Sequence, residues 1–167
     1  MSRADAGLEL LDLLRSIPDP EVPALDIVEL GIVRAVEVGP DGVVRVDVTP
    51  TYSGCPAMRV IEDDIVAALR AHGREKVELR TVYSPPWTTD WLSDEAKAKL
   101  KAYGIAAPGR APTDQELVPL TSSVRHVDCP FCGSSNTERK SEFGATACKA
   151  IHYCHHCRQP FEEFKPL

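Results

Sequence analysis

Hydrophobic residues recur at helical spacing in two stretches of the first half of the chain. In residues 4–16 the apolar positions lie three or four apart, and the three prolines of residues 18–23 end this stretch in an extended loop. In residues 58–72 a stripe of Val, Ile, Ala and Leu faces a run of acidic residues on the opposite side. Both stretches therefore predict amphipathic helices.

Segments rich in Val and Ile predict strands around the second helix. Residues 27–38 and 43–48 flank the turn sequence of residues 39–42, and together they predict a β-hairpin. Apolar and polar side chains alternate in residues 43–48, so we expect this strand to bury one face only. Residues 76–83 predict a third strand, and residues 93–103 predict a third helix that ends at a glycine.

Periodicity is lost in residues 105–122, which contain three prolines and predict a linker over residues 108–122. The predicted fold class is α+β. A small α/β domain of order α-β-β-α-β-α spans residues 1–107, and a second, smaller domain spans residues 123–167. A length of 167 residues accommodates one medium domain and one small one.

The composition is that of a globular protein, with 43% hydrophobic and 26% charged residues. The net charge of -6, without clusters of Lys and Arg, argues against nucleic acid as a partner. No apolar run approaches the roughly 18–20 residues of a membrane span, and the N-terminus lacks a basic stretch followed by an apolar one. We expect a cytoplasmic protein that does not bind membranes.

Four of the six cysteines form two CxxC pairs. Cys129 and Cys132 form the first pair, Cys154 and Cys157 form the second, and the 21 residues between them approach the spacing of four-thiolate zinc sites. We therefore predict a β zinc ribbon with a structural zinc ion that fills all four positions. The metal would supply the folding free energy that so short a segment cannot obtain from apolar burial.

Other uses of these cysteines stay open at this point. The first pair resembles a glutaredoxin active site, although the residues after it predict no helix. An iron-sulfur cluster would use the same four thiolates, so the sequence does not separate zinc from iron. Disulfides are disfavoured because the chain shows no secretion signal.

Cys148 lies six residues before Cys154 and is too far along a predicted strand to reach the same ion. We expect a buried small residue there, with a free or cluster-related thiol as the alternative. His152, His155 and His156 are expected at the surface around the metal rather than among its ligands.

The sixth cysteine, Cys55, precedes Pro56, and proline favours the first position of a helix. We therefore predict Cys55 at the N-cap of the second helix. There the helix dipole and the exposed N–H groups would favour a thiolate, which is how reactive cysteines are commonly made. An inert core cysteine is the alternative.

The motifs of the first domain resemble the SufT-like family of metal-sulfur cluster assembly proteins over about residues 8–106. The likeness rests on Asp19-Pro-Glu-Val-Pro23, residues 26–33, Thr49-Pro-Thr, Cys55-Pro56 and residues 84–90. It implies a compact α/β domain that helps to load iron-sulfur clusters onto client proteins, with a reactive cysteine at Cys55. Asp19 and Glu21 match the acidic motif of that family.

The cysteine-rich segment resembles the accessory subunits of the phenylacetyl-CoA epoxidase system. The likeness rests on Cys129-Pro-Phe-Cys132-Gly-Ser, residues 143–150, Cys154-His-His-Cys157 and Pro160-Phe161. It implies an accessory subunit of phenylacetate degradation that does not carry the di-iron chemistry of the epoxidase.

Two functions follow from these residues. In the first, Cys55, supported by Asp19 and Glu21, holds or transfers iron or a transient iron-sulfur cluster, and the zinc module docks a protein client. In the second, the chain is a non-catalytic scaffold with a structural zinc, and Cys55 merely packs. An enzyme is disfavoured, because no motif joins a nucleophile, a base and an orienting group. A polar and aromatic cluster, formed by Trp87, Thr88, Asp90 and Trp91, either anchors the third helix or lines a docking surface.

Overall fold

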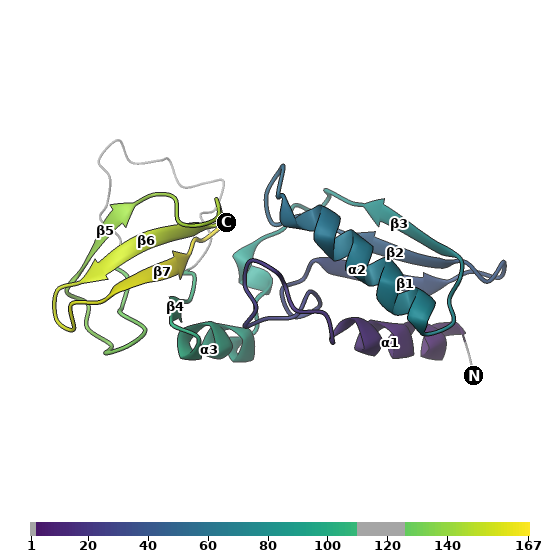
Figure 1. The fold of residues 1–167 in the computed structure, drawn as a ribbon, viewed down its shortest axis with the longest axis horizontal. Coiled ribbons are helices and arrows are strands. Elements are labelled where there is room, and N and C mark those ends of the chain that lie inside the picture. Colours follow the sequence, from purple (N-terminus) through teal and green to yellow (C-terminus); the bar gives the residue numbers. More distant parts are fainter. Residues whose placement is uncertain (1–2, 110–125) are drawn as a thin grey trace. The chain divides into compact units, whose positions relative to one another are not determined.

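The computed structural model describes residues 3–109 and 126–167, and the chain divides into two compact units. The N-terminal unit is Met1–Trp87, and the C-terminal unit is Thr88–Leu167. Each unit contains its own β-sheet, as Figure 1 shows.

The N-terminal unit combines two helices with a three-stranded sheet. Its elements are α1 (Arg3–Leu14), β1 (Val33–Val38), β2 (Val44–Val48), α2 (Ala57–Ala71) and β3 (Val77–Thr81). β1 and β2 pair antiparallel as the predicted hairpin, and β3 pairs parallel to β2 after the crossover through α2. β2 is therefore the central strand and is covered by partners on both edges.

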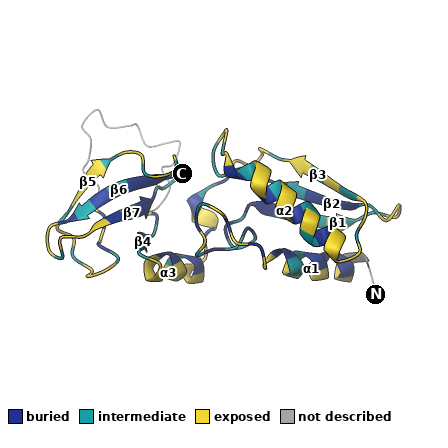
Figure 2. Cartoon of the chain, in the orientation of Figure 1, coloured by how far each residue is buried: buried dark blue, intermediate teal, exposed yellow. Residues whose placement is uncertain are grey.

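The core of this unit lies between the helices and one face of the sheet (Figure 2). Among its fully buried side chains are Leu10, Leu14, Val44, Val46, Val48, Ile65 and Leu69. The other face of the sheet is polar, with ion pairs from Arg45 to Glu78 at 3.1 Å and from Arg80 to Asp47 at 2.7 Å. The prediction that the second strand buries one face only is confirmed.

Residues 27–32 are not part of a strand, so this part of the strand prediction is wrong. Asp26 Oδ1 accepts hydrogen bonds from the backbone N–H groups of Val28 at 2.8 Å and Glu29 at 2.7 Å, and these bonds begin a turn. The apolar side chains of the turn are buried, which produces the same hydrophobic run as a strand. β1 begins only at Val33.

The C-terminal unit combines a helix with a four-stranded sheet. Its elements are the 3-10 helix η1 (Thr89–Trp91), α3 (Asp94–Ala102), β4 (Ile105–Ala106), β5 (Thr137–Ser141), β6 (Lys149–Cys154) and β7 (Pro160–Phe164). The strand order is β4-β7-β6-β5, and only β4 runs parallel to its neighbour. The α+β class and the order of the predicted elements are confirmed, while η1 and β4 are additions.

Residues 88–109 group with the ribbon rather than with the N-terminal unit. β4 pairs with β7, and the Oγ1 of Thr88 donates a hydrogen bond to the carbonyl of Leu167 at 2.8 Å. The predicted first domain, residues 1–107, thus extends past the point where the compact units divide, because strand pairing over a long sequence separation leaves no local signal. The predicted linker, residues 108–122, lies outside the described residues except for its first two.

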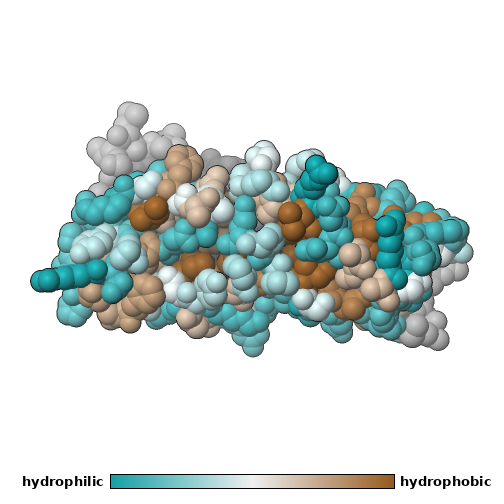
Figure 3. Space-filling model, in the orientation of Figure 1, coloured by the Kyte–Doolittle hydropathy of each residue, from teal (hydrophilic) through white to brown (hydrophobic). Residues whose placement is uncertain are grey.

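The surface in Figure 3 is a mosaic in which hydrophobic residues emerge in small groups between hydrophilic ones. None of the helices in the described parts of the chain is long and apolar enough to cross a membrane.

Candidate metal centre and thiol site

Two tight turns place the four CxxC cysteines around one point. Cys129 and Cys132 flank a turn before β5, and Cys154 and Cys157 flank the turn between β6 and β7. The turns are closed in the same way. The N–H of the residue after each pair donates to the carbonyl of the first cysteine, at 2.8 Å and 2.9 Å.

The residue that closes each turn has a left-handed backbone. Gly133, with φ of 72°, closes the first turn, and Arg158, with φ of 60°, closes the second. Glycine adopts this conformation at no steric cost, so Gly133 was a usable signal in the sequence. Arg158 gives no such signal, because a non-glycine residue rarely adopts this conformation.

The sulfur atoms fit a tetrahedral metal ion. All four Sγ atoms lie within 4.8 Å of one another. Cys129 lies 3.6 Å from Cys157, and Cys132 lies 3.6 Å from Cys154. Four sulfurs that each lie about 2.3 Å from a zinc ion are about 3.8 Å apart, so the set has nearly the required size.

The thiols of the second turn differ in acidity. The backbone N–H groups of Cys157 and His156 donate to the sulfur of Cys154, and with neighbouring thiols they lower its pKa to about 6. Burial, together with the neighbouring thiols, raises the pKa of Cys157 to about 12. Because a metal binds thiolates, loading this site releases protons. The N–H groups that favour the thiolate belong to the turn itself.

Apolar side chains bury the centre from one side. Cys129 and Cys154 are fully buried and pack with Ala106, Val127 and Phe161. With four thiolates as ligands, no coordination position remains for water or substrate, so the donor set is that of a structural site.

His152 is buried, contrary to the expectation that it lies at the surface. Its Nε2 lies 2.8 Å from Glu163 Oε2, and the two side chains have exposed fractions of only 3% and 5%. Its ring also stacks on Phe161, with 5.4 Å between ring centroids. His152 faces the core because side chains two apart on a strand share a face, and the next such residue is the buried candidate ligand Cys154. His155 and His156 are exposed, as expected.

Cys148 is not part of the metal centre. It is 3% exposed, and it directly precedes β6, whereas Cys154 ends that strand. The Oγ1 of Thr146 lies 3.0 Å from its sulfur. The expectation of a buried residue out of reach of the metal ligands is confirmed.

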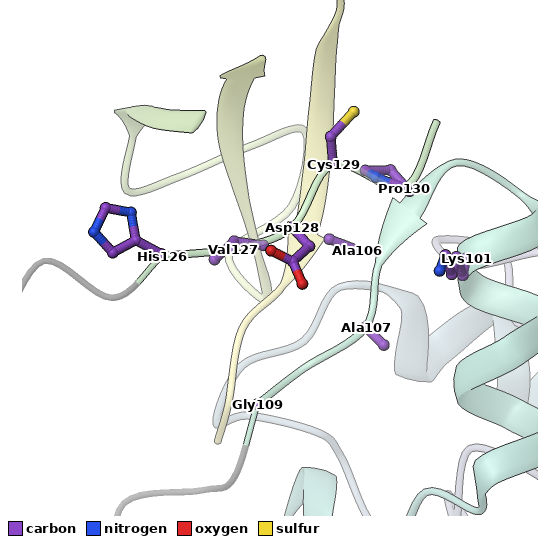
Figure 4. A pocket seen from close by; sticks show the side chains of 9 residues that line it. All are labelled: Lys101, Ala106, Ala107, Gly109, His126, Val127, Asp128, Cys129 and Pro130. Carbon is purple, nitrogen blue, oxygen red and sulfur yellow. The ribbon is translucent and has the colours of Figure 1, made fainter. Parts of the chain in front are cut away.

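A hollow of about 250 Å³ lies beside the first CxxC turn. Lys101, Asp128 and Cys129 are among the residues that line it, and Figure 4 shows the sulfur of Cys129 directed away from the other lining side chains. The hollow therefore adjoins the candidate metal centre, but this thiol does not point into it.

Cys55 lies beside the N-terminus of α2, but not at its N-cap. The N-cap is Pro56, whose φ of -69° and ψ of -23° are already helical, so the predicted capping position is wrong by one residue. The turn before it holds Cys55 in place. The N–H of Cys55 donates to the carbonyl of Tyr52 at 3.3 Å, and Gly54 has φ of 84°.

The environment of Cys55 favours the neutral thiol, contrary to the predicted thiolate. Burial raises the pKa of Cys55, and the charges of Glu21 and Asp19 raise it further. Hydrogen bonds from the N–H of Ala57 and the side chain of Tyr52 act in the opposite direction and are outweighed. A helix terminus is visible in the sequence, whereas burial and the nearby carboxylates are not.

The predicted residues Asp19 and Glu21 therefore lie close enough to Cys55 to act on its charge. Asp19 is 4% exposed, and its Oδ1 accepts hydrogen bonds from the N–H groups of Glu21 at 2.9 Å and Val22 at 2.7 Å. Asp19 thus shapes the loop that carries Glu21. Sequence reasoning missed Tyr52, although a glycine between it and Cys55 was a signal for the turn that joins them.

Trp87 is 6% exposed in the N-terminal unit, where its indole N–H donates to the carbonyl of Leu30 at 2.8 Å. Trp91 lies in the C-terminal unit and is 37% exposed.

Each unit matches a different family model. Residues 9–80 match the model described as iron-sulfur cluster assembly protein, and residues 113–165 match the PaaD zinc beta ribbon domain. The first match lies within the N-terminal unit and includes Cys55, and the second includes all four cysteines of the metal centre.

Similar proteins cover either nearly the whole chain or its first part. An Escherichia coli K12 protein, named as a putative subunit of 1,2-phenylacetyl-CoA epoxidase, is 43% identical over 94% of this chain and 91% of its own. The Fe-S protein maturation auxiliary factor SufT of Staphylococcus aureus is 42% identical over 49% of this chain and 93% of its own.

A crystal structure of the DUF59 domain of Bacillus anthracis superimposes with a TM-score of 0.56 at 30% identity. The match covers 60% of this chain and 95% of that domain. The chain therefore belongs to the PaaD family of phenylacetyl-CoA epoxidase subunits, which join an iron-sulfur cluster assembly domain to a zinc ribbon.

Proposed function

We propose that this chain is an accessory maturation factor of the phenylacetyl-CoA epoxidase system, which loads an iron-sulfur cluster or iron onto a protein client in the cytoplasm and is not itself an enzyme. Two kinds of relative support it: an epoxidase subunit along the whole chain, and Fe-S maturation factors along its first part. In this role the cluster is cargo rather than a resident cofactor.

The observation that carries the proposal is the grouping of one thiol with two carboxylates. Cys55, Asp19 and Glu21 come from segments more than thirty residues apart, yet the two charges act on the thiol. A thiolate is a soft ligand typical of iron-sulfur clusters, and carboxylates attract the cation. A cluster needs about four ligands. One cysteine therefore leaves positions for the thiolates of a client, as a transfer site requires.

The raised pKa of Cys55 is compatible with transient binding. The thiol stays protonated until a metal replaces its proton, so binding is weaker and more easily reversed than at a preformed thiolate. The nearby carboxylates oppose the thiolate but favour an incoming cation, which offsets part of that cost.

In the C-terminal unit, Cys129, Cys132, Cys154 and Cys157 would hold zinc. When bound, the zinc supplies folding free energy and closes the ribbon. The ribbon is then a rigid element that a client can dock against.

The test is metal and acid-labile sulfide content of the protein and of co-expressed epoxidase components, purified without air. Cys55→Ala should abolish cluster loading of the client while zinc stays at one per chain, and Cys148→Ala, the matched cysteine control, should leave both unchanged. Normal cluster content in the client with Cys55→Ala would contradict the proposal.

The alternative function is a scaffold subunit in which Cys55 only packs. The raised pKa of Cys55 favours it, because a half-buried thiol that keeps its proton is less reactive than a thiolate. In that case Cys55→Ala keeps full epoxidase activity, and a truncation that removes the ribbon abolishes it.

A further inference from the structure

The cysteines of the chain differ in their access to solvent. All six lie within the described residues, and among them Cys132 alone is exposed. The other five are buried or half-buried: Cys129, Cys148 and Cys154 are buried, and Cys55 and Cys157 are half-buried. The candidate metal centre therefore has one ligand that is open to solvent and two that are covered.

The first CxxC turn produces this difference between its own two cysteines. Cys129, at the start of the turn, packs with Val127 and Phe161 and is fully buried. Cys132 and Gly133, at its end, are both exposed. A Cβ at Gly133 would meet no atom within 4 Å outside the neighbouring residues, so this end of the turn is not covered by another segment of the structure. A small solute can therefore reach Cys132 while Cys129 stays shielded.

The position of Cys132 has the features of an oxidisable thiol. A thiol that coordinates a metal ion loses its proton, and the thiolate is the nucleophilic form of cysteine. Cysteines that react with peroxides are typically thiolates that solvent can reach, with a second cysteine beside them to take up the oxidised sulfur. The sulfur of Cys154 lies 3.6 Å from that of Cys132, so the second cysteine is in place.

The neighbouring sulfurs belong to different turns. Cys132 lies beside Cys154, and Cys129 lies beside Cys157, also at 3.6 Å. A disulfide bond is about 2 Å long, so each of these pairs could close with a shift of less than about 2 Å. The CxxC spacing alone would suggest a bond within one motif, whereas the structure predicts a bond between the two turns.

We propose that Cys132 is the site at which a hydroperoxide, such as hydrogen peroxide, oxidises the metal centre, and that Cys154 then forms a disulfide with it. In the first step the thiolate of Cys132 attacks a peroxide oxygen, the O–O bond breaks, and a sulfenic acid forms as hydroxide leaves. In the second step the thiolate of Cys154 attacks this sulfur, the S–S bond forms, and a second hydroxide leaves. The two sulfurs lose two electrons, and the peroxide takes up both.

The disulfide removes two of the four metal ligands. Only Cys129 and Cys157 remain as thiolates, which is too few for the closed four-thiolate site, so the metal is released. The ribbon then loses the folding free energy that the metal supplies. This inference does not depend on cluster loading by the N-terminal unit, so it can hold or fail independently of the proposed function.

The test treats the full-length, zinc-loaded protein with hydrogen peroxide. A chromogenic chelator follows the release of zinc, and dimedone traps sulfenic acid for peptide mapping by mass spectrometry. Dimedone should label Cys132 before any other cysteine. Without dimedone, the mapped disulfide should join Cys132 to Cys154, with one zinc released for each disulfide formed. Thiol reductant and added zinc should restore one zinc per chain.

Two ligand replacements separate oxidation at Cys132 from general weakening of the centre. Histidine is also a zinc ligand, so Cys132→His keeps four ligands and removes the exposed sulfur. It should release zinc to peroxide about tenfold more slowly than wild type or slower still. The matched control is Cys157→His, which alters the same centre but keeps Cys132 and Cys154, and it should release zinc within about twofold of the wild-type rate.

Several results would overturn the proposal. These are first labelling at a cysteine other than Cys132, a disulfide within one CxxC pair, wild-type protein that keeps its zinc in peroxide, or release from Cys132→His at the wild-type rate. The mapping needs no variant, so it decides the question even where Cys132→His does not bind zinc.

Discussion

Different interactions stabilise the N-terminal unit and the C-terminal unit. The N-terminal unit buries a continuous apolar core between α1, α2 and its sheet, and few polar side chains lie inside it. The C-terminal unit buries fewer large apolar side chains and contains three of the buried titratable ones, Lys149, His152 and Glu163. We expect a metal ion bound at its four-cysteine centre to supply the folding free energy that its apolar core does not.

This difference shows how one chain combines two routes to stability. Apolar burial grows with the number of residues that can face inward, so the larger α/β arrangement suffices for the N-terminal unit. Three short strands with charged outer edges bury little surface, so we expect the ribbon to need a bound metal for its stability. The candidate thiol would then lie in the unit that stays folded when the metal is removed.

Metal removal should have the largest effect on stability, and it should act on the C-terminal unit alone. Zinc binding contributes about 10–16 kcal/mol in zinc-finger peptides, so chelation should unfold the ribbon and leave the N-terminal unit folded. Hydrogen exchange measured by mass spectrometry should show lost protection in β6 and β7 and unchanged protection in β2. Persistent protection of β6 in metal-free protein would contradict this dependence on metal.

Truncating a side chain in the apolar core of the N-terminal unit should destabilise that unit and leave the metal centre intact. Leu69→Ala removes a fully buried side chain of α2 and should lower the free energy of unfolding of the N-terminal unit by about 2–5 kcal/mol. Urea denaturation measures the change, and the zinc content should stay at one per chain. The control is Val60→Ala, at a position 49% exposed on the same helix, which should shift stability by less than about 0.5 kcal/mol.

The buried pair His152–Glu163 tests whether polar contacts also stabilise the ribbon. Glu163→Ala removes the acceptor that lies 2.8 Å from His152 and should cost about 1–3 kcal/mol of ribbon stability even with zinc bound. Glu142→Ala, at an ion pair with Arg139 on the exposed surface, should be close to neutral. Equal midpoints for the two variants in urea would mean that the buried pair does not contribute.

The smallest effect concerns the acidity of Cys55. Because burial, Glu21 and Asp19 raise its pKa, the folded state binds this proton more tightly than the unfolded chain does. The resulting stability is complete below the unfolded pKa of about 8.5 and is lost as pH rises through the folded value. Alkylation of Cys55 by iodoacetamide should therefore be slow near neutral pH.

Glu21→Gln tests the cause of this shift. Removing one negative charge should lower the pKa of Cys55 and speed its alkylation at about pH 8, just below the ordinary pKa of a free thiol, while the exposed control Glu37→Gln should behave as wild type. Mass spectrometry of the Cys55 peptide across a pH series gives the profile. Identical profiles for Glu21→Gln and wild type would show that Glu21 does not act on the thiol.

Local patterns in the sequence were enough to predict most of the helices and strands and to locate the four cysteines that meet at the candidate metal centre. Period-3.6 and period-2 patterns produced the helices and the hairpin, since these depend on neighbours a few residues apart. The two CxxC pairs identified the candidate ligands because each turn is local. The turn at residues 27–32 was predicted as a strand, because a buried turn and a buried strand both produce a run of hydrophobic residues.

Only the tertiary structure decided which distant residues meet. It paired β3 with β2 and β4 with β7, buried His152 against Glu163, and placed the carboxylates of the Asp19 loop near Cys55. Burial and charge from distant segments then reversed the predicted acidity of that thiol. Such effects depend on separations in space rather than along the chain, and the spacing of residues in a sequence does not encode them.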